Sequence, residues 1–443
     1  MNDILTRMNS PERAVRLSAA KELGHLIDEG KLKRTVSKET NNHIHTIYSF
    51  SPYSPSMAAY KAWEAGLAAA GSVDHESVTA GMEIVEACRY LGIGSTVGLE
   101  VRVHFTGTPL EGKKFNNPDT LNNAYIIIHG IPHQKINEVA RFLEPINRAR
   151  DIRIEAEVKR LNELLGNLGV DPLDYEKDVA AISETYDGGS ITERHILYAL
   201  SLKLIGRVGK GEAMISFLTE TLELKLPALV SEWLLDDKNP HYAYDLLGVL
   251  KSGFMHRFFV QPDETECPFV GTVVDFANSI SAIPAYSYLG DVGESPTGDK
   301  KAEHFEDDYL EELFPVVKKL GFKALAYMPP RNSIEQLKRV QVLASKWDLM
   351  EISGVDINSS RQAFNCPEIL MDEFSHLIGT TWALIAHEHA ATRDIKYGLF
   401  NPENPMAARP LSERLSIYGV AGEGMDPKNP DKVLDLIMVK ERE

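Results

Sequence analysis

The stretch SVDHESVTAGMEIVEACRYLGIGSTVGLEVRVHF, residues 72–105, carries the pattern on which the predicted fold depends. SVDHES is typical of the end of a strand, and AGMEIVEACRYLGI has the apolar spacing of a helix that ends at Gly92-Ile93-Gly94. STVGLEVRVHF is typical of a second strand. A strand, a helix and a strand in this order predict parallel strands that are joined by a crossover helix.

The same alternation continues on both sides of this stretch. Upstream, the sequence predicts a helix over residues 11–38, a strand in HIHTIYSF, and a helix in SMAAYKAWEAGLAAA that ends near Gly71. Downstream, YIIIHGIP (125–132) is typical of a buried strand, and residues 134–255 are mainly helical in pattern. Helices and strands alternate again from about residue 268 to a strand that ends on Asp356, which predicts an α/β fold with a helical insertion.

The chain is acidic, with 64 Asp and Glu against 47 Lys and Arg. This balance argues against general nucleic-acid binding, which needs a basic surface, whereas a small phosphorylated substrate can be neutralised locally. The 3 cysteines form no C-x-x-C pair, so no disulfide framework is expected. Because the first 30 residues lack an apolar core and no long apolar run occurs, we expect a cytoplasmic protein without a membrane span. The oligomeric state is left open.

Side chains that can bind metals follow three successive predicted strands. His43 and His45 close the first strand, Asp74 and His75 close the second, and Glu100 closes the third. Active sites of parallel barrels collect at the carboxyl ends of the strands. Two imidazoles at positions i and i+2 of a strand project to the same side, so they can share one borderline divalent cation such as Zn²⁺, Mn²⁺ or Fe²⁺.

The ordered motifs H-x-H-T-x-x-S, V-D-H and G-L-E resemble those of the PHP (polymerase and histidinol phosphatase) family of metal-dependent phosphoesterases. The insert with GGSITERHILYAL is similar to that of the family's nucleotide and nucleic-acid branch. LGFKALAYMPPRNSIEQLKRVQVLASKWDLMEISGVDIN resembles the last helix and strand, which end in an S-D-x-H motif. The resemblance covers roughly residues 38–362 and implies a distorted (β/α)₇ TIM-like barrel with a metal site at the strands' carboxyl ends.

With this resemblance the chain divides into five predicted parts. They are an N-terminal helical segment (1–38), the first half of the barrel (39–133), a helical insert (134–267), the second half of the barrel (268–362), and a C-terminal helical extension with a tail (363–443). A second H-x-H, residues 387–389, falls in a helical pattern of this extension. Positions i and i+2 of a helix point apart, so we expect these residues on the helix surface without a metal.

The resemblance also implies a set of metal ligands. Four residues match the ligands of one metal: His43, His45, Glu100 and Asp356. His75 matches a ligand of a different metal position or could serve as a general acid, and Asp74 would orient that site through hydrogen bonds; these two are the catalytic candidates. The family's middle histidine has two candidates here, His129 in IIIHG and His256 in GFMHRFF.

Three positions depart from the family pattern. Ser51, Tyr286 and Asn358 stand where the family has further metal ligands. Hydroxyl and amide groups are poorer ligands than imidazole for such cations. We therefore expect one divalent metal, Zn, Mn or Fe, in place of the family's three.

Four residues are candidates for binding the substrate. Arg194 and His195 lie on a helix of the insert, where the resembling branch carries an R-x-H motif near its substrate. Arg331 follows MPP on a loop that lies near the phosphate in the family, and a guanidinium suits phosphate. Tyr286 would offer its hydroxyl to the substrate.

The leading hypothesis is a PHP-like phosphoesterase that hydrolyses a small phosphate monoester or a nucleotide-type phosphodiester with a metal-activated water. The first alternative is a catalytically weakened protein of this fold that binds a metal or a metabolite. The second alternative is a metal-dependent hydrolase that acts on a bond other than a phosphate ester.

Overall fold

The chain contains a single seven-stranded sheet, in a computed structural model that describes residues 1–117, 120–291 and 304–442. Residues 292–303 of the predicted second half of the barrel lie outside the described residues. The strands follow one another in the sheet in chain order. They are β1 (Thr40–Ile44), β2 (Ala69–His75), β3 (Gly94–His104), β4 (Asn123–His129), β5 (Ile283–Ser287), β6 (Ala324–Tyr327) and β7 (Met350–Ser353).

The sheet curls into a nearly closed barrel. Strands β1 to β3 are parallel, as are β5 to β7, while β4 runs antiparallel to both of its neighbours. After β7 the chain returns to β1, where the Ile357 amide donates to the His43 carbonyl at 3.1 Å and the His45 amide donates to the Ile357 carbonyl at 2.9 Å. The α/β class and the distorted seven-stranded TIM-like barrel predicted from the sequence are therefore confirmed.

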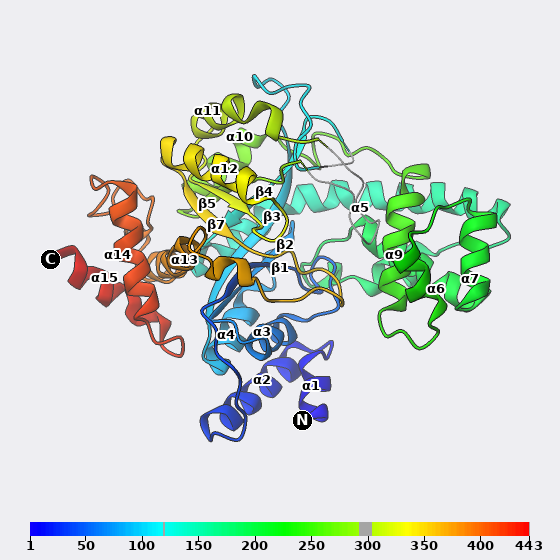
Figure 1. Cartoon of the computed structure of the whole chain (residues 1–443), viewed down its shortest axis with the longest axis horizontal. Coiled ribbons are helices and arrows are strands. Elements are labelled where there is room, and N and C mark those ends of the chain that lie inside the picture. Colours follow the sequence, from blue (N-terminus) through cyan, green and yellow to red (C-terminus); the bar gives the residue numbers. More distant parts are fainter. Residues whose placement is uncertain (118–119, 292–303, 443) are drawn as a thin grey trace.

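Helices surround this barrel and extend to both sides of it (Figure 1). Local signals mark several starts: Ser54 caps α3 through the Met57 amide, and Ser333 with Gln336 forms a capping box on α12. The helices are α1 (Asn2–Met8), α2 (Arg13–Asp28), α3 (Pro55–Glu64), α4 (Gly81–Leu91), α5 (Ile136–Asn167), α6 (Glu193–Val208), α7 (Glu212–Ser216), α8 (Ala228–Leu235), α9 (Tyr242–Gly253), α10 (Val270–Ser279), α11 (Leu310–Lys319), α12 (Ile334–Lys346), α13 (His376–Arg393), α14 (Leu411–Glu423) and α15 (Val433–Arg442).

The predicted helix over SMAAYKAWEAGLAAA is wrong in its second half. Helix α3 ends at Glu64, because Gly66 adopts a left-handed backbone with φ of 87° that stops the helix. Ala69 and Ala70 then belong to β2 despite the high helix propensity of alanine. The N-terminal helix is also shorter than the predicted residues 11–38, since α2 ends at Asp28.

Helix α13 closes the end of the barrel opposite the carboxyl ends of the parallel strands. Its residues Trp382, Leu384 and Ile385 pack with inward-facing strand residues such as Ala69 and Ile127 in one buried cluster. The second H-x-H of the sequence lies on this helix, and the prediction that it is exposed is wrong: His387, Glu388 and His389 are all buried. The Glu388 carboxylate accepts hydrogen bonds from the Thr96 hydroxyl and the Val97 amide of β3, each at 2.6 Å.

Helices α5 to α9 form a helical lobe on one side of the barrel, with a hydrophobic core of their own. A buried ion-pair network joins this lobe to the barrel. Its arginines and glutamates come from β3, from loops of the barrel and from α5 and α6: Arg102, Arg150, Arg153, Glu76, Glu157, Glu193 and Glu266. Such groups are costly to separate once they are buried, so the network holds the insert against the barrel.

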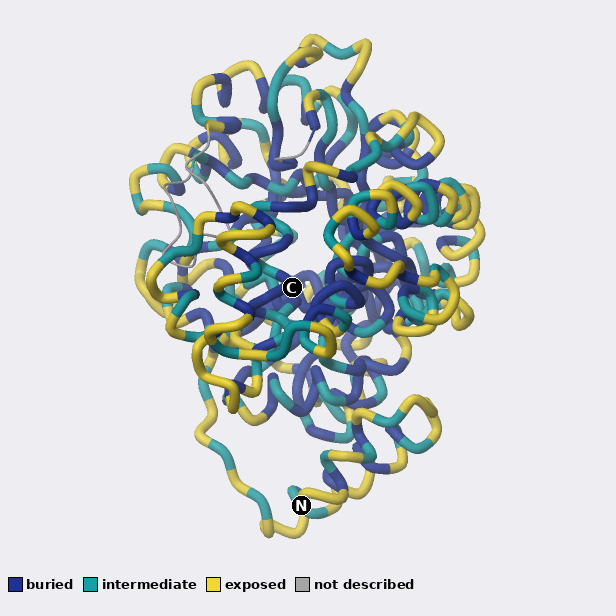
Figure 2. The backbone as a smooth tube through the Cα atoms, turned by 90° about the vertical axis from the view of Figure 1, so that its right-hand side faces the viewer, coloured by how far each residue is buried: buried dark blue, intermediate teal, exposed yellow. Residues whose placement is uncertain are grey.

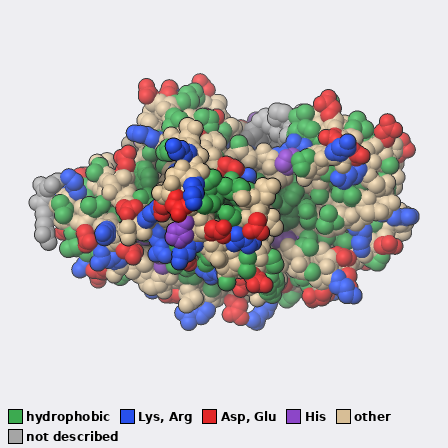
Figure 3. All heavy atoms as spheres, turned by 90° about the horizontal axis from the view of Figure 1, so that it is seen from below, with side chains coloured by type: hydrophobic (Ala, Val, Ile, Leu, Met, Phe, Trp, Pro, Cys, Tyr) green, Lys and Arg blue, Asp and Glu red, His purple; other side chains and the backbone are tan. Residues whose placement is uncertain are grey.

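Burial follows this architecture. The backbone is buried in the interior and exposed at the outer turns and near the N-terminus (Figure 2). Acidic and basic side chains are interspersed on the face seen from below (Figure 3). None of the helices in the described part of the chain combines the length and the apolar character that crossing a membrane requires.

Candidate metal centre

A β-bulge in β1 aims the two histidines of the first H-x-H. Asn41 pairs with Ala70 and Ile44 pairs with Ser72, so Asn42 and His43 together face one residue of β2, Gly71. A Cβ atom on Gly71 would lie only 3.1 Å from the Cα of Asn42, which shows why a glycine stands there. The bulge brings the Nε2 atoms of His43 and His45 to 3.2 Å from each other.

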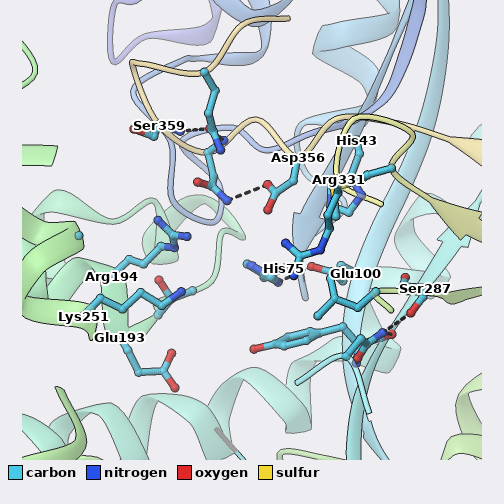
Figure 4. Close-up of a pocket in the computed structure, with 18 of the residues that line it drawn as sticks. His43, His75, Glu100, Glu193, Arg194, Lys251, Ser287, Arg331, Asp356 and Ser359 are labelled. Atoms are coloured by element: carbon cyan, nitrogen blue, oxygen red, sulfur yellow. Dashed lines mark hydrogen bonds and ion pairs between the residues drawn. The ribbon is translucent and has the colours of Figure 1, made fainter. Parts of the chain in front are cut away.

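The two histidines of the H-x-H pair lie close to the carboxylates of Glu100 and Asp356. Ligand atoms of His43, His45 and Glu100 all lie within 4.8 Å of one another. The Oδ1 atom of Asp356 lies 3.3 Å from Nε2 of His45. Two nitrogens that are each about 2.1 Å from a zinc ion at a tetrahedral angle lie roughly 3.4 Å apart, so these separations fit ligands of one cation. Figure 4 shows His43, Glu100 and Asp356 around one pocket.

Ser49 and Asp74 fix the orientation of His45. The Asp74 carboxylate accepts hydrogen bonds from the amide of Thr46 at 2.6 Å, its hydroxyl at 2.7 Å, and the hydroxyl of Ser49 at 2.7 Å. Because Ser49 donates its only proton to Asp74, its oxygen accepts from Nδ1–H of His45, 3.3 Å away. This tautomer leaves the lone pair of Nε2 free for a metal.

Asn358 holds the carboxylate of Asp356. Its Nδ2 donates to Oδ1 of Asp356 at 2.7 Å. Gln362 in turn accepts from the backbone amides of Asn358, at 2.6 Å, and Ser359, at 2.7 Å. Asn358, which the sequence predicts to stand where the family has a histidine, is therefore bonded to a candidate ligand.

His75 lies beside this group at the end of β2. Its Nδ1 atom is 3.1 Å from Oε2 of Glu100, and its ring centroid is 4.6 Å from that of His45. His75 is thus placed to act as a further ligand or as a proton donor to a molecule in the pocket.

Burial and mutual charge set the protonation of the site. Burial lowers the pKa of His43. Burial also disfavours the charged form of His45, but its bond to Asp356 and the negative charges of Asp356 and Glu100 outweigh this, so the pKa of His45 is raised. Burial opposes ionisation of Glu100 and Asp356, and the neighbouring histidines reverse this and lower the pKa of both. A metal has to displace the proton of His45, so affinity falls as the pH falls.

His129 lies one layer deeper in the barrel. Neither of its ring nitrogens has a hydrogen-bond partner within the described part of the chain. Burial, followed by repulsion from His43, lowers the pKa of His129 to about 3, so the ring is neutral. It does not belong to the group of three that lies within 4.8 Å. The other candidate for the family's middle histidine, His256, lines the pocket from the insert side.

The candidate metal ligands open into a cavity of about 1230 Å³ between the barrel mouth and the insert. Arg194 and Lys251 reach into it from the insert and Arg331 from the loop after β6 (Figure 4). Aromatic and apolar residues of the insert line its far side, among them Trp233, Tyr244, Leu247, Met255 and Phe259. The cavity thus joins a cluster of metal ligands, basic side chains and an apolar wall.

The loop that carries Asp356 is clasped to the insert. The Arg361 guanidinium bonds to both carboxylate oxygens of Asp245, at 2.6 and 2.7 Å, and lies 3.9 Å from the ring centre of Trp233. His241 and Ser360 are hydrogen-bonded at 2.7 Å. This clasp connects the insert to a candidate ligand through only a few residues.

The prediction for Tyr286 needs correction. Its side chain points away from the mouth into a buried hydrophobic cluster, and its hydroxyl donates to Glu306 at 2.9 Å. Successive residues of a strand face opposite sides, and here the next one, Ser287, lines the pocket. The pocket is therefore lined by Ser287 in place of Tyr286.

The prediction for His195 also needs correction. His195 is buried, and its Nδ1 accepts a hydrogen bond from the Thr192 amide at 3.0 Å, which completes the capping box of α6. Its ring packs edge-on against Phe50. Its neighbour Arg194 faces the pocket, so only one residue of the pair is available to a substrate.

Sequence reasoning missed several contributors to the site. Ser49 was present as the last residue of the H-x-H-T-x-x-S motif, but no rule assigned it a contact. Lys251 and Arg361 lay in stretches without a motif, and only the packing of the insert on the barrel brings them to the pocket.

No protein-family model matches the chain, and no curated protein matches its sequence. The solved structures that are similar to it include the following two. One is described as a "putative metal-dependent phosphoesterase" from Bifidobacterium adolescentis and has 15% sequence identity and a TM-score of 0.48, over 75% of this chain and 94% of its own. The other, an amidohydrolase from Chromobacterium violaceum with bound sulfate and no metal, has 14% identity and a TM-score of 0.48, over 74% of this chain and 90% of its own.

Proposed function

We propose that the chain is a metal-dependent phosphoesterase that hydrolyses a small phosphate monoester or a nucleotide-type phosphodiester. The observation that carries this proposal is the joint presence, in one pocket, of metal-ligating side chains and of Arg194 and Arg331. Guanidinium groups bind phosphoryl oxygens in a bidentate manner. A metal on its own would fit many reactions, and the arginines favour a phosphorylated substrate.

The donor set fits a borderline divalent cation: two imidazoles and two carboxylates, with one imidazole held in the ligating tautomer by Ser49. Such an ion would polarise the phosphoryl group and ease deprotonation of a water. His43, His45, Glu100 and Asp356 would hold it. Ser51 does not join them, since its hydroxyl accepts from the Tyr53 amide at 3.4 Å. We infer a single metal position from this reduced set.

The other residues of the pocket bind and orient the ester. Arg331 and Arg194 hold the phosphoryl group from the barrel side and the insert side. His75 delivers a proton to the leaving oxygen, since its ring lies at the edge of the ligand group with part of its side chain exposed to the pocket. The apolar wall around Trp233 and Tyr244 receives the organic part of the substrate.

A second candidate function is a protein of this fold that binds a metal or a metabolite without turnover. The observation that favours it is the hydrogen bond from Asn358 to Asp356, because a position that the resemblance assigns to a metal ligand supports a neighbouring side chain here. The two candidates differ in turnover and share the metal centre.

The test is a panel of phosphate monoesters, phosphodiesters and amides, offered to protein that has been stripped with a chelator and reloaded with Mn²⁺, Fe²⁺ or Zn²⁺. We expect metal-dependent release of phosphate and a KM about tenfold higher or more in Arg331→Gln, because a charge-assisted contact to the substrate is lost. Arg141→Gln, an exposed arginine of α5, is the matched control. Turnover of amides alone would refute the phosphoesterase in favour of a hydrolase that acts on another bond. No turnover with any metal would refute it and leave the second candidate.

A further inference from the structure

A small cavity of about 230 Å³ lies far from the metal centre, where the C-terminal extension meets the barrel. Lys323, which directly precedes β6, lines it, so the cavity is at the amino end of the parallel strands, whereas the metal ligands are at their carboxyl ends. Figure 1 shows α14 on the side of the barrel away from the insert helices α6, α7 and α9. The lining residues are Lys318, Lys323, Asp348, Phe400, Asn401, Pro402, Ala407 and Arg414.

Three cations converge on this cavity without a carboxylate partner. Lys318, Lys323 and Arg414 are half-buried, and none of them forms an ion pair with an acidic side chain within the described part of the chain. Lys318 donates to the backbone carbonyl of Asp348 at 3.0 Å, and the side chain of Asp348 is exposed. In a chain with a formal charge of −17, this grouping is unusual, because acidic side chains are abundant elsewhere.

One donor of the cluster is left unsatisfied. The Nε atom of Arg414 is buried and has no hydrogen-bond partner among the described residues, although its Nη1 donates to the Leu399 carbonyl at 2.6 Å. Burial, and then repulsion from Lys318 and Arg414, lowers the pKa of Lys323. A buried donor without an acceptor is costly, and like charges in a partly buried site add to the cost. An anion in the cavity would relieve both.

The surrounding structure holds these groups in place. The Arg414 guanidinium lies 5.6 Å from the ring centre of Phe400. The backbone before Phe400 is fixed by a hydrogen bond from the Leu399 amide to Nδ1 of the buried His387, at 2.8 Å. Lys323 is bonded through its backbone to β5 and β7, at the Pro284 carbonyl and the Met350 amide, each at 3.0 Å. The cations are therefore carried by a rigid frame, as a binding site requires.

We propose that this cavity binds a small multivalent oxyanion of the phosphate type, held by Lys318, Lys323 and Arg414. Guanidinium and ammonium groups together match the oxygens of such an ion. The cavity is smaller than the roughly 300–1,000 Å³ of pockets that bury drug-sized ligands, so the ligand is a free oxyanion or a short phosphorylated or dicarboxylic molecule. This site is independent of the proposed phosphoesterase activity.

The test is isothermal titration calorimetry of the full chain, stripped of metal, with sodium phosphate at low ionic strength. Parallel titrations with sulfate, succinate and chloride separate phosphate-type from carboxylate ligands and from simple charge screening. We expect saturable binding of phosphate, weakened about tenfold or more in Lys323→Gln and in Arg414→Gln. Lys319→Gln, which removes the same charge from an exposed neighbour at the end of α11, should bind as the unaltered chain does.

Phosphate could also bind at the barrel mouth, so the double variant Arg194→Gln/Arg331→Gln is titrated as well. Binding that survives in this variant and is lost in Lys323→Gln supports the proposal. The proposal is overturned if binding is lost in the double variant and kept in Lys323→Gln. It is also overturned if Lys323→Gln, Arg414→Gln and Lys319→Gln bind equally well, or if no phosphate binds in the millimolar range. Thermal unfolding without phosphate checks that each variant is folded, and in the unaltered chain added phosphate should raise the unfolding midpoint.

Discussion

The hydroxyl of Ser49 accepts from His45 and donates to Asp74, and this single side chain decides which nitrogen of His45 is free. We predict that Ser49→Ala weakens metal binding about tenfold or more, because partners behind a ligand typically contribute that much. Metal-competition titration with a fluorescent chelator measures the change. Ser51→Ala is the control in the same loop, since among the described residues the Ser51 side chain bonds to the Tyr53 amide and to no candidate ligand. Equal metal affinities of the two variants would show that Ser49 does not orient His45 for metal binding.

The buried carboxyl group of Glu306 should make the stability of the chain depend on pH. Burial raises the pKa of Glu306 to about 7, against an ordinary 4.5, although Tyr286 and the Gly290 amide donate to it. Between these values the folded chain binds more protons than the unfolded chain, so this contribution to stability is full below pH 4.5 and is lost as the pH rises through 7. In the unaltered chain, Glu306 should therefore lower the free energy of unfolding by up to about 3 kcal/mol between pH 5 and pH 8. This decrease should be absent in Glu306→Gln.

Urea unfolding at the two pH values measures this loss. Glu163→Gln, an exposed glutamate of α5, is the control and should leave the pH dependence of the unaltered chain. A pH dependence in Glu306→Gln equal to that of the control would contradict the raised pKa.

Residues also show where prediction from sequence stops. The family resemblance, together with the predicted strand ends, was sufficient to bring together His43, His45, Glu100 and Asp356. Tyr286 was chosen by alignment with a family motif, and the inward-facing position of β5 is one residue later. A single-residue shift reverses the face of a strand, and no local signal in AIPAYS reports it.

At the scale of elements, the clasp between the loop after β7 and the insert makes a prediction. Arg361→Ala leaves the buried carboxylate of Asp245 without its charged partner, with Asn239 as its remaining donor, which should destabilise the docked insert by about 1–3 kcal/mol. Hydrogen exchange in α8 and α9 should become faster, and substrate affinity should fall because Asp356 sits on the same loop. Arg207→Ala, an exposed arginine at the end of α6, is the control. Unchanged exchange in α8 and α9 would show that Arg361 does not hold the insert.

Elements were predictable where a local signal marks them. The helix and strands of residues 72–105 are close to α4, the end of β2 and β3. The AAG run was assigned to a helix, since alanine favours helices, but the barrel needs small side chains there for the approach of α13 and for the bulge of β1. The burial of the second H-x-H on α13 follows from packing against β3, which no short-range pattern encodes.

At the scale of the whole molecule, the two ends of the barrel differ in structure. One end is filled by α13, and the other opens toward the insert and carries the candidate ligands. The barrel could be predicted because the order of motifs along the chain resembles that of a known family. The position of the insert and the shape of the cavity depend on contacts between parts more than 100 residues apart, such as Arg361 with Asp245, 116 residues apart, and sequence patterns do not report these.

The most direct test of the central claim, that His43, His45, Glu100 and Asp356 form one metal centre, is the metal content of chelator-stripped protein after reconstitution and gel filtration. Elemental analysis should find about one divalent ion per chain, and at most a small fraction of that in His45→Ala and in Asp356→Ala. His25→Ala, an exposed histidine of α2, should keep the full amount. Less than about 0.2 ion per chain in the unaltered protein, or an unchanged content in both ligand variants, would contradict the account.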